Sequence, residues 1–150
     1  LILKEYDHVI VVSQYDEILQ YASQRGALGI LCLESIHGLS YSIKAAVSYL
    51  NTLEKPFRMI FMVADQPYIS MNTIDKLMHT KHKLASCAYK DKVGNPTLFD
   101  SSYIPELLLL KQDQGGRKVL NKHPDEVEYI QVENIIELYD IDYQEDLKQQ

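Results

Sequence analysis

Short apolar runs alternate with amphipathic stretches along the first half of the chain. The runs are too short for helices and contain β-branched residues, so they predict buried strands. They cover residues 8–12, 28–33 and 57–64. Between them, residues 15–25 and 40–53 repeat apolar positions at intervals of three and four, which predicts two helices. Gly26 is a C-cap for the first helix. This order predicts an α/β fold whose parallel strands are joined by right-handed crossovers.

The second half of the chain continues the pattern more loosely. It predicts helices over residues 71–82, 101–110 and 115–121, and strands over residues 85–89 and 127–132. Ser70 is the expected N-cap of the first of these helices. Asp142, followed by Glu145, is typical of a capping box that opens a last helix over residues 143–148. Because there is no repeat and no linker, we expect a single domain over residues 1–150.

Composition narrows the possible classes of function. The chain has 150 residues with a formal net charge of -6, which argues against nucleic-acid binding through a basic face. Residues 1–100 carry 10 acidic and 10 basic residues, so the excess of acid lies after residue 100. No stretch approaches the roughly 20 apolar residues of a membrane span, so no membrane partner is expected. Cys32 and Cys87 lie in apolar surroundings without CxxC spacing, which favours buried, reduced thiols and a cytoplasmic protein.

The end of the apolar run at 57–64 is the most informative point for chemistry. Asp65-Gln66-Pro67 follows at once, and ligands of open α/β sheets bind beyond the carboxyl ends of the strands. A carboxylate in that place suits Mg²⁺, which takes one or two carboxylates together with phosphate oxygens of a substrate. The alternative is that Asp65 only caps a turn, and the pattern favours neither interpretation.

Three further segments are weaker when each is taken alone. Gly38-Leu39-Ser40-Tyr41-Ser42 places a glycine and two hydroxyls at the start of a helix, which suits a polar cradle for a ligand. The simpler interpretation makes Ser40 an ordinary N-cap. Gly94-Asn95-Pro96 is typical of a turn between strands, and Asp113-Gln114-Gly115-Gly116-Arg117 of a loop that leads into a helix.

In order and combination, these segments resemble the MobA-like nucleotidyltransferase family, which includes the molybdenum cofactor cytidylyl- and guanylyltransferases. Residues 94–99 are similar to the family's Gly-x-Pro segment, and residues 112–117 to its Gly-Asp-x-Gly-x-Arg segment, with Gln112 in place of the first glycine. Residues 140–147 are similar to Asp-Ile-Asp-Thr-Pro-Glu-Asp-Leu, with Tyr143-Gln144 in place of Thr-Pro. The resemblance spans residues 8–147. The sequence Ala64-Asp65-Gln66-Pro67 is more similar to the cytidylyltransferase and xanthine dehydrogenase accessory branch.

The resemblance implies a role for each matched residue. Asp65 would ligate the Mg²⁺ that bridges the nucleotide phosphates, and Gln66 would bind substrate. Asp142 is the candidate second acid near the metal, with a pure N-cap role as an equally good alternative. The base and ribose side of the pocket would be lined by Gly38, Leu39, Ser40 and Ser42. The acceptor side, where molybdopterin binds, would be shaped by Gly94, Pro96, Gly115, Gly116 and Arg117.

The fold that the resemblance implies is a Rossmann-like three-layer α/β sandwich with a mostly parallel sheet. The family opens with a strand and a Gly-rich loop, Leu-Ala-Ala-Gly-x-Ser-x-Arg-Met-Gly, followed by a lysine, and these groups hold a triphosphate. The 150 residues contain no such segment. We therefore expect a nucleotidyltransferase-like domain without its first strand, and exposed apolar surface on the neighbours of that strand.

These observations predict a Mg²⁺-dependent enzyme that transfers CMP from CTP to the molybdopterin cofactor and releases pyrophosphate. A xanthine dehydrogenase-type molybdoenzyme is the implied downstream partner. Two alternatives stay open: a nucleotidyltransferase that uses GTP or a sugar phosphate, and a truncated domain without catalytic activity.

Overall fold

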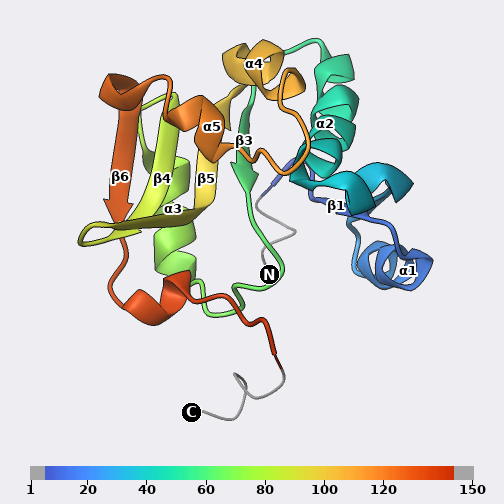
Figure 1. Ribbon diagram of the computed structural model, residues 1–150, viewed down its shortest axis with the longest axis horizontal. Helices are drawn as coiled ribbons and strands as arrows, with labels where there is room; N and C mark the ends of the chain where they lie inside the picture. Colours follow the sequence, from blue (N-terminus) through green and yellow to red (C-terminus); the bar gives the residue numbers. More distant parts are fainter. Residues whose placement is uncertain (1–5, 144–150) are drawn as a thin grey trace. The chain divides into compact units, whose positions relative to one another are not determined.

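A computed structural model describes residues 6–143 of the chain (Figure 1). These residues form two compact units. The first contains residues 6–55 and 102–119, and the second contains residues 56–101 and 120–143. Within the described residues, no helix is both long enough and apolar enough to cross a membrane.

The first unit begins with a strand–helix–strand motif. β1 (Ile10–Ser13) and β2 (Leu28–Leu31) are parallel, and α1 (Asp16–Gln24) connects them. Gly26 adopts φ 85 just after α1, in the left-handed region where glycine is favoured, as predicted for a C-cap. The predicted parallel crossover is therefore confirmed, with strands that are one and two residues shorter than the two apolar runs.

Helices complete the first unit. α2 (Leu39–Leu50) packs against β1 and against α4 (Ile104–Leu108), and its buried face includes Ile43 and Val47. Short 3₁₀ turns flank α2, namely η2 (Leu33–His37) and η3 (Asn51–Leu53). The boundary between the units runs through two short helices, η4 (Ser101–Tyr103) and α5 (Arg117–Leu120).

The second unit is built on a four-stranded sheet in the order β3-β5-β4-β6 (Figure 1). Its strands are β3 (Arg58–Phe61), β4 (Leu84–Tyr89), β5 (Lys92–Asp100) and β6 (Val127–Gln131). β5 pairs antiparallel with both β3 and β4, whereas β4 and β6 are parallel. The α/β class is confirmed, and the sheet of this unit is mixed.

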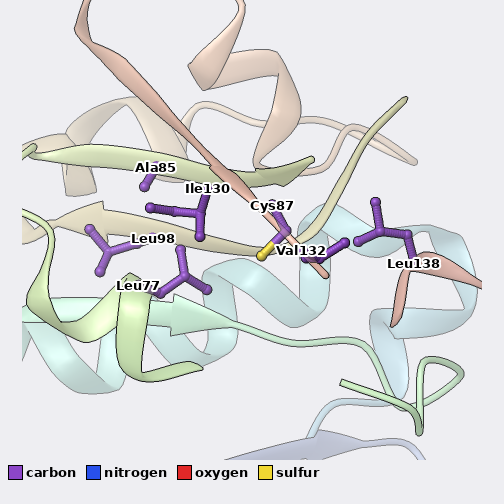
Figure 2. Close-up of a cluster of buried hydrophobic side chains, with 7 residues drawn as sticks. All are labelled: Leu77, Ala85, Cys87, Leu98, Ile130, Val132 and Leu138. Carbon is purple, nitrogen blue, oxygen red and sulfur yellow. The ribbon is translucent and has the colours of Figure 1, made fainter. Parts of the chain in front are cut away.

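The core of the second unit lies between this sheet and α3 (Met71–His79). Leu77 of α3 is fully buried and packs into a cluster with residues of β4, β5 and the chain around β6 (Figure 2). The other members are Ala85, Cys87, Leu98, Ile130, Val132 and Leu138.

Burial, followed by the nearby charge of Glu137, raises the pKa of the Cys87 thiol to about 12. Cys32 is also buried, and both thiols are free, as the sequence predicted.

β5 is the element that the sequence did not reveal. The turn of its hairpin with β4 lies at Lys90 and Asp91, not at residues 94–96, and Lys90 has φ 52. Asn95 and Pro96 sit in β5 where the register with β4 shifts, since Ser86 faces Thr97 but Cys87 faces Gly94. The interpretation of Gly94-Asn95-Pro96 as a turn is wrong because a bulge accommodates a proline within a strand.

Three other predicted boundaries need correction. The strand expected over residues 57–64 ends at Phe61, and the helix expected over 71–82 ends at His79 because Thr80 turns to an extended ψ of 144. Residues 101–110 form two short helical segments, η4 and α4, and not one helix. The helix expected over residues 143–148 lies outside the described residues, apart from its first position.

Truncation of the core should cost far more stability than truncation of the surface. Leu98 is 1% exposed in the cluster of Figure 2, so we expect Leu98→Ala to lower the free energy of unfolding by about 2–5 kcal/mol. Met62 of the same unit is 49% exposed, and Met62→Ala should cost about 0.5 kcal/mol or less. Urea unfolding monitored by circular dichroism measures both, and equal losses would contradict the placement of Leu98.

Candidate functional site

Asp65 lies in a turn that follows β3 in the second unit. Three residues separate it from the end of the strand at Phe61, and its side chain is exposed. Its backbone carbonyl accepts a hydrogen bond of 2.8 Å from the backbone N–H of Ile141. The turn thus presents the carboxylate of Asp65 to solvent while its main chain is bound to a segment 76 residues further on.

Gln66 strengthens the link between the same two segments. Its Nε2 donates a hydrogen bond of 2.7 Å to Oδ1 of Asp140, and the residue is 8% exposed. Its Oε1 is buried and has no hydrogen-bond partner among the described residues. Asp142 is exposed and follows Ile141 directly, so the structure brings Asp65 and Asp142 to the same part of the second unit.

Glu137 is a polar residue of this region that sequence reasoning missed. It is only 4% exposed, and its Oε2 accepts hydrogen bonds from the Ser70 backbone N–H at 3.0 Å and from Thr73 Oγ1 at 2.6 Å. Burial acts to raise the pKa of Glu137, but these hydrogen bonds outweigh it and hold the pKa below its usual value. The sequence contained one indication of such a residue. Ser70 is the N-cap of α3, but the third helical residue is Thr73 and not the Glu or Gln that completes a capping box, so the helix itself supplies no carboxylate for the Ser70 N–H.

In the first unit, Gly38 and Ser40 begin α2. The N-cap is Gly38, with φ 136, and Ser40 is the second helical residue, so the interpretation of Ser40 as the N-cap is wrong. The Ser40 backbone N–H donates to the carbonyl of Gln112 at 2.9 Å. The Ser40 side chain is fully buried, and its Oγ has no hydrogen-bond partner among the described residues. Ser42, the fourth residue of α2, is half-buried, and Leu39, its first residue, is exposed.

The loop at residues 112–117 meets the start of α2 in this same unit. A Cβ added to Gly38 would overlap the carbonyl group of Gln112 and lie 2.7 Å from the Asp113 nitrogen. A Cβ on Gly115 would lie 2.9 Å from Leu39 Cδ2. Gln112 itself has φ 50, a conformation that favours glycine. The two segments of the first unit that the sequence singled out are therefore in direct contact.

Gly116 and Arg117 complete this loop, whereas Gly94 and Pro96 have a different setting. Arg117 is exposed at the start of α5, and Gly116 is half-buried. Pro96 is fully buried in the sheet of the second unit, and the nearest side chain to a Cβ at Gly94 is that of Leu138, at 3.7 Å. Gly94 and Pro96 thus shape β5, and any effect of these two residues on a ligand would be indirect, through the conformation of that strand.

The types of donor that the segments around Asp65 and Asp142 carry are those that a hard divalent cation takes. Within the part of the chain that the structure describes, no group of three or more His, Cys, Asp or Glu side chains converges as a metal site. Asp65 and Asp142 contribute two exposed carboxylates to the same region, and the buried Oε1 of Gln66 has no hydrogen-bond partner among the described residues. Mg²⁺ commonly takes one or two carboxylates and completes its shell with water and phosphate oxygens. This donor set suits an ion that a nucleotide shares.

The family of the chain follows from its sequence. Residues 2–127 match the model of the MobA-like NTP transferase domain. The chain belongs to this family. Among curated proteins, none matches its sequence.

Solved structures agree with this fold assignment. A nucleotidyl transferase from Methanothermobacter superposes with a TM-score of 0.78 at 16% identity, covering 98% of this chain and 73% of the other. The Rv0371c protein of Mycobacterium tuberculosis in complex with manganese gives a TM-score of 0.76 at 20% identity, covering 95% and 76%. The molybdopterin-guanine dinucleotide biosynthesis protein A of Archaeoglobus fulgidus gives 0.62 at 20% identity, covering 98% and 80%.

In this MobA-like domain, close contact between Gly38 and the 112–117 loop makes Gly38 irreplaceable. We expect Gly38→Ala to lower the free energy of unfolding by about 3 kcal/mol or more, since the added Cβ meets backbone and φ 136 strains a non-glycine residue. Gly26→Ala is the matched control because φ is also positive but no atom of the described residues lies within 4 Å of the added Cβ, so its cost should be about 1 kcal/mol. Urea unfolding compares the two, and equal costs would refute the close approach.

The buried carboxylate of Glu137 should make the stability of the MobA-like domain depend on pH. Since the folded-state pKa lies below the ordinary value of 4.5, its stabilising effect is present above that value and is lost as the pH falls through the folded-state pKa. The stability advantage of the wild type over Glu137→Gln should therefore be constant above about pH 6 and shrink below about pH 4. Urea unfolding between these values tests this, and an advantage that grows on acidification would contradict the lowered pKa.

Proposed function

We propose that this domain transfers CMP from CTP to the molybdopterin cofactor and releases pyrophosphate, with Mg²⁺ as the metal. The observation that carries the proposal is the pair of contacts that join Asp65-Gln66 to Asp140-Ile141, because they link the segments that carry Asp65 and Asp142. The family membership supports the reaction class, and the manganese complex of a structural neighbour supports a divalent cation.

Asp65 and Asp142 would hold the metal ion in this proposal. When bound, the ion neutralises phosphate charge and orients the nucleotide. The protein has little covalent chemistry to perform in phosphoryl transfer, so its task is to position the two substrates and to balance charge. The Gln66–Asp140 hydrogen bond serves this task, since it fixes the turn that carries Asp65.

The residues at the start of α2 would bind the base and ribose. Gly38, Leu39, Ser40 and Ser42 lie at the N-terminus of a 12-residue helix, where partial positive charge favours anionic or acceptor groups. The buried Ser40 hydroxyl, which has no hydrogen-bond partner among the described residues, supports a polar role for this helix start. Gly115, Gly116 and Arg117 would shape the acceptor side, and the exposed guanidinium of Arg117 suits the phosphate of molybdopterin.

GTP is the alternative nucleotide. Ala64-Asp65-Gln66-Pro67 favours CTP through its similarity to the cytidylyltransferase branch. The Archaeoglobus neighbour, whose name refers to molybdopterin-guanine dinucleotide, favours a guanine nucleotide.

Asp65→Asn should abolish metal-dependent nucleotide binding while leaving the fold intact. The exposed side chain bears no packing role, and the substitution keeps its size but removes the charge that attracts the cation. Calorimetric titration with CTP in Mg²⁺ and in EDTA measures the effect, with circular dichroism as the check of folding. Asp75→Asn is the matched control, because Asp75 is an exposed aspartate of α3 in the same unit.

The same titration decides between the two nucleotides. We expect CTP to bind at least about tenfold more tightly than GTP, a difference of roughly 1.4 kcal/mol. Tighter binding of GTP would replace the cytidylyl assignment by the guanylyl one. Metal-independent binding, or full binding by Asp65→Asn, would overturn the proposed metal role.

A further inference from the structure

Two short segments of the second unit are joined to each other at both ends. The first runs from Asp65 to Ser70, and the second runs from Glu137 to Ile141. At one end, the backbone and side-chain bonds of residues 65–66 hold residues 140–141. At the other end, the Glu137 carboxylate accepts the Ser70 N–H. The two segments therefore form a closed loop of chain and hydrogen bonds.

The Glu137 end of this loop completes the cap of α3. Ser70 Oγ accepts the Thr73 N–H at 3.2 Å, which is the usual half of a capping box. The other half, a carboxylate that accepts the N–H of the N-cap residue, comes from Glu137 and not from the helix itself. Thr73 adds its own hydroxyl as a second donor to the same oxygen. The carboxylate also lies at the N-terminus of α3, where the helix dipole favours negative charge.

The chain after Glu137 is held in place by side-chain and backbone contacts and not by regular secondary structure. Residues 139–142 belong to neither helix nor strand, and the side chains of Asp140 and Asp142 are exposed. Leu138 is buried in the core, and Lys92 Nζ donates to its carbonyl, so it ties the chain to the sheet. Glu137 ties the same chain to α3, whose N-cap is five residues after Asp65.

We propose that Glu137 is a positioning residue of the metal site. Through the N-terminus of α3, Glu137 holds residues 140–142 against the turn that contains Asp65. This proposal rests on the proposed function, because Asp65 and Asp142 are the ligands proposed there. Glu137 itself would touch neither the metal nor the nucleotide. Its carboxylate sets where the Asp142 segment leaves the core, and hence how the two exposed carboxylates share one cation.

Two substitutions of Glu137 separate positioning from charge. Both hydrogen bonds end on Oε2, so the amide oxygen of Glu137→Gln can accept both and should preserve the arrangement. Glu137→Ala leaves the Ser70 N–H and the Thr73 hydroxyl without their acceptor. Arg58→Met is the matched control, since the Arg58 guanidinium bonds to the carbonyls of Met78 and Thr80 at the opposite end of α3.

Two measurements on the full chain test the proposal. Electron paramagnetic resonance of free Mn²⁺ gives the affinity of the site without any need for turnover. We expect Glu137→Ala to raise the Kd by about tenfold or more, as for lost supporting contacts at other metal sites. Glu137→Gln and Arg58→Met should stay within about threefold of the wild type. Hydrogen exchange should show that the Ile141 amide, which bonds to Asp65, loses protection in Glu137→Ala alone.

The outcomes are distinguishable from failure of the proposed function. Wild-type affinity and Ile141 protection in Glu137→Ala would overturn the positioning role. So would an equal loss in Arg58→Met, because it would reduce the effect to general destabilisation of α3. If Asp65→Asn binds Mn²⁺ as well as the wild type, the proposed metal ligand is wrong, and Ile141 exchange in Glu137→Ala against Arg58→Met still decides whether Glu137 holds the segment.

Discussion

A single buried carboxylate organises the polar end of the second unit. Glu137 satisfies the N-terminus of α3 and accepts the Thr73 hydroxyl. An unpaired carboxylate buried to this degree would be costly, whereas one that receives two hydrogen bonds stabilises the ionised form. Because the chain returns to Asp65 within four residues of Glu137, the cap of a helix and the assembly of a candidate cation site are one structural feature.

In the first unit, two segments distant in sequence are joined by a close contact between their backbones. Gly38 allows the carbonyl group of Gln112 to reach the first turn of α2, where Ser40 N–H donates to it. The contact joins a loop and a helix start that are more than 70 residues apart in sequence. It satisfies one of the amides at the helix N-terminus that have no partner within the helix. Each unit thus brings distant polar segments together, one through side chains and the other through main chain.

Sequence reasoning succeeded where a local pattern had one physical meaning. The run before Asp65 predicted a strand end, and Gly26 predicted a left-handed C-cap; both are present, although the strand ends earlier. It failed at β5, whose glycine, asparagine and proline are typical of a turn but lie at a bulge in the pairing of β5 with β4. It also assigned Ser40 as an N-cap, because composition does not reveal that Gly38 takes that position.

The amino-acid sequence by itself determined the α/β class, the parallel crossover of the first unit, the family and the identity of the candidate residues, since periodicity and short motifs are local properties of the chain. Only the tertiary structure decided the partners: that Asp140 and Ile141 meet Gln66 and Asp65, and that Glu137 caps α3. The physical reason is that a hydrogen-bonding group must find a partner once it is buried. The sequence shows the group, and the fold selects the partner.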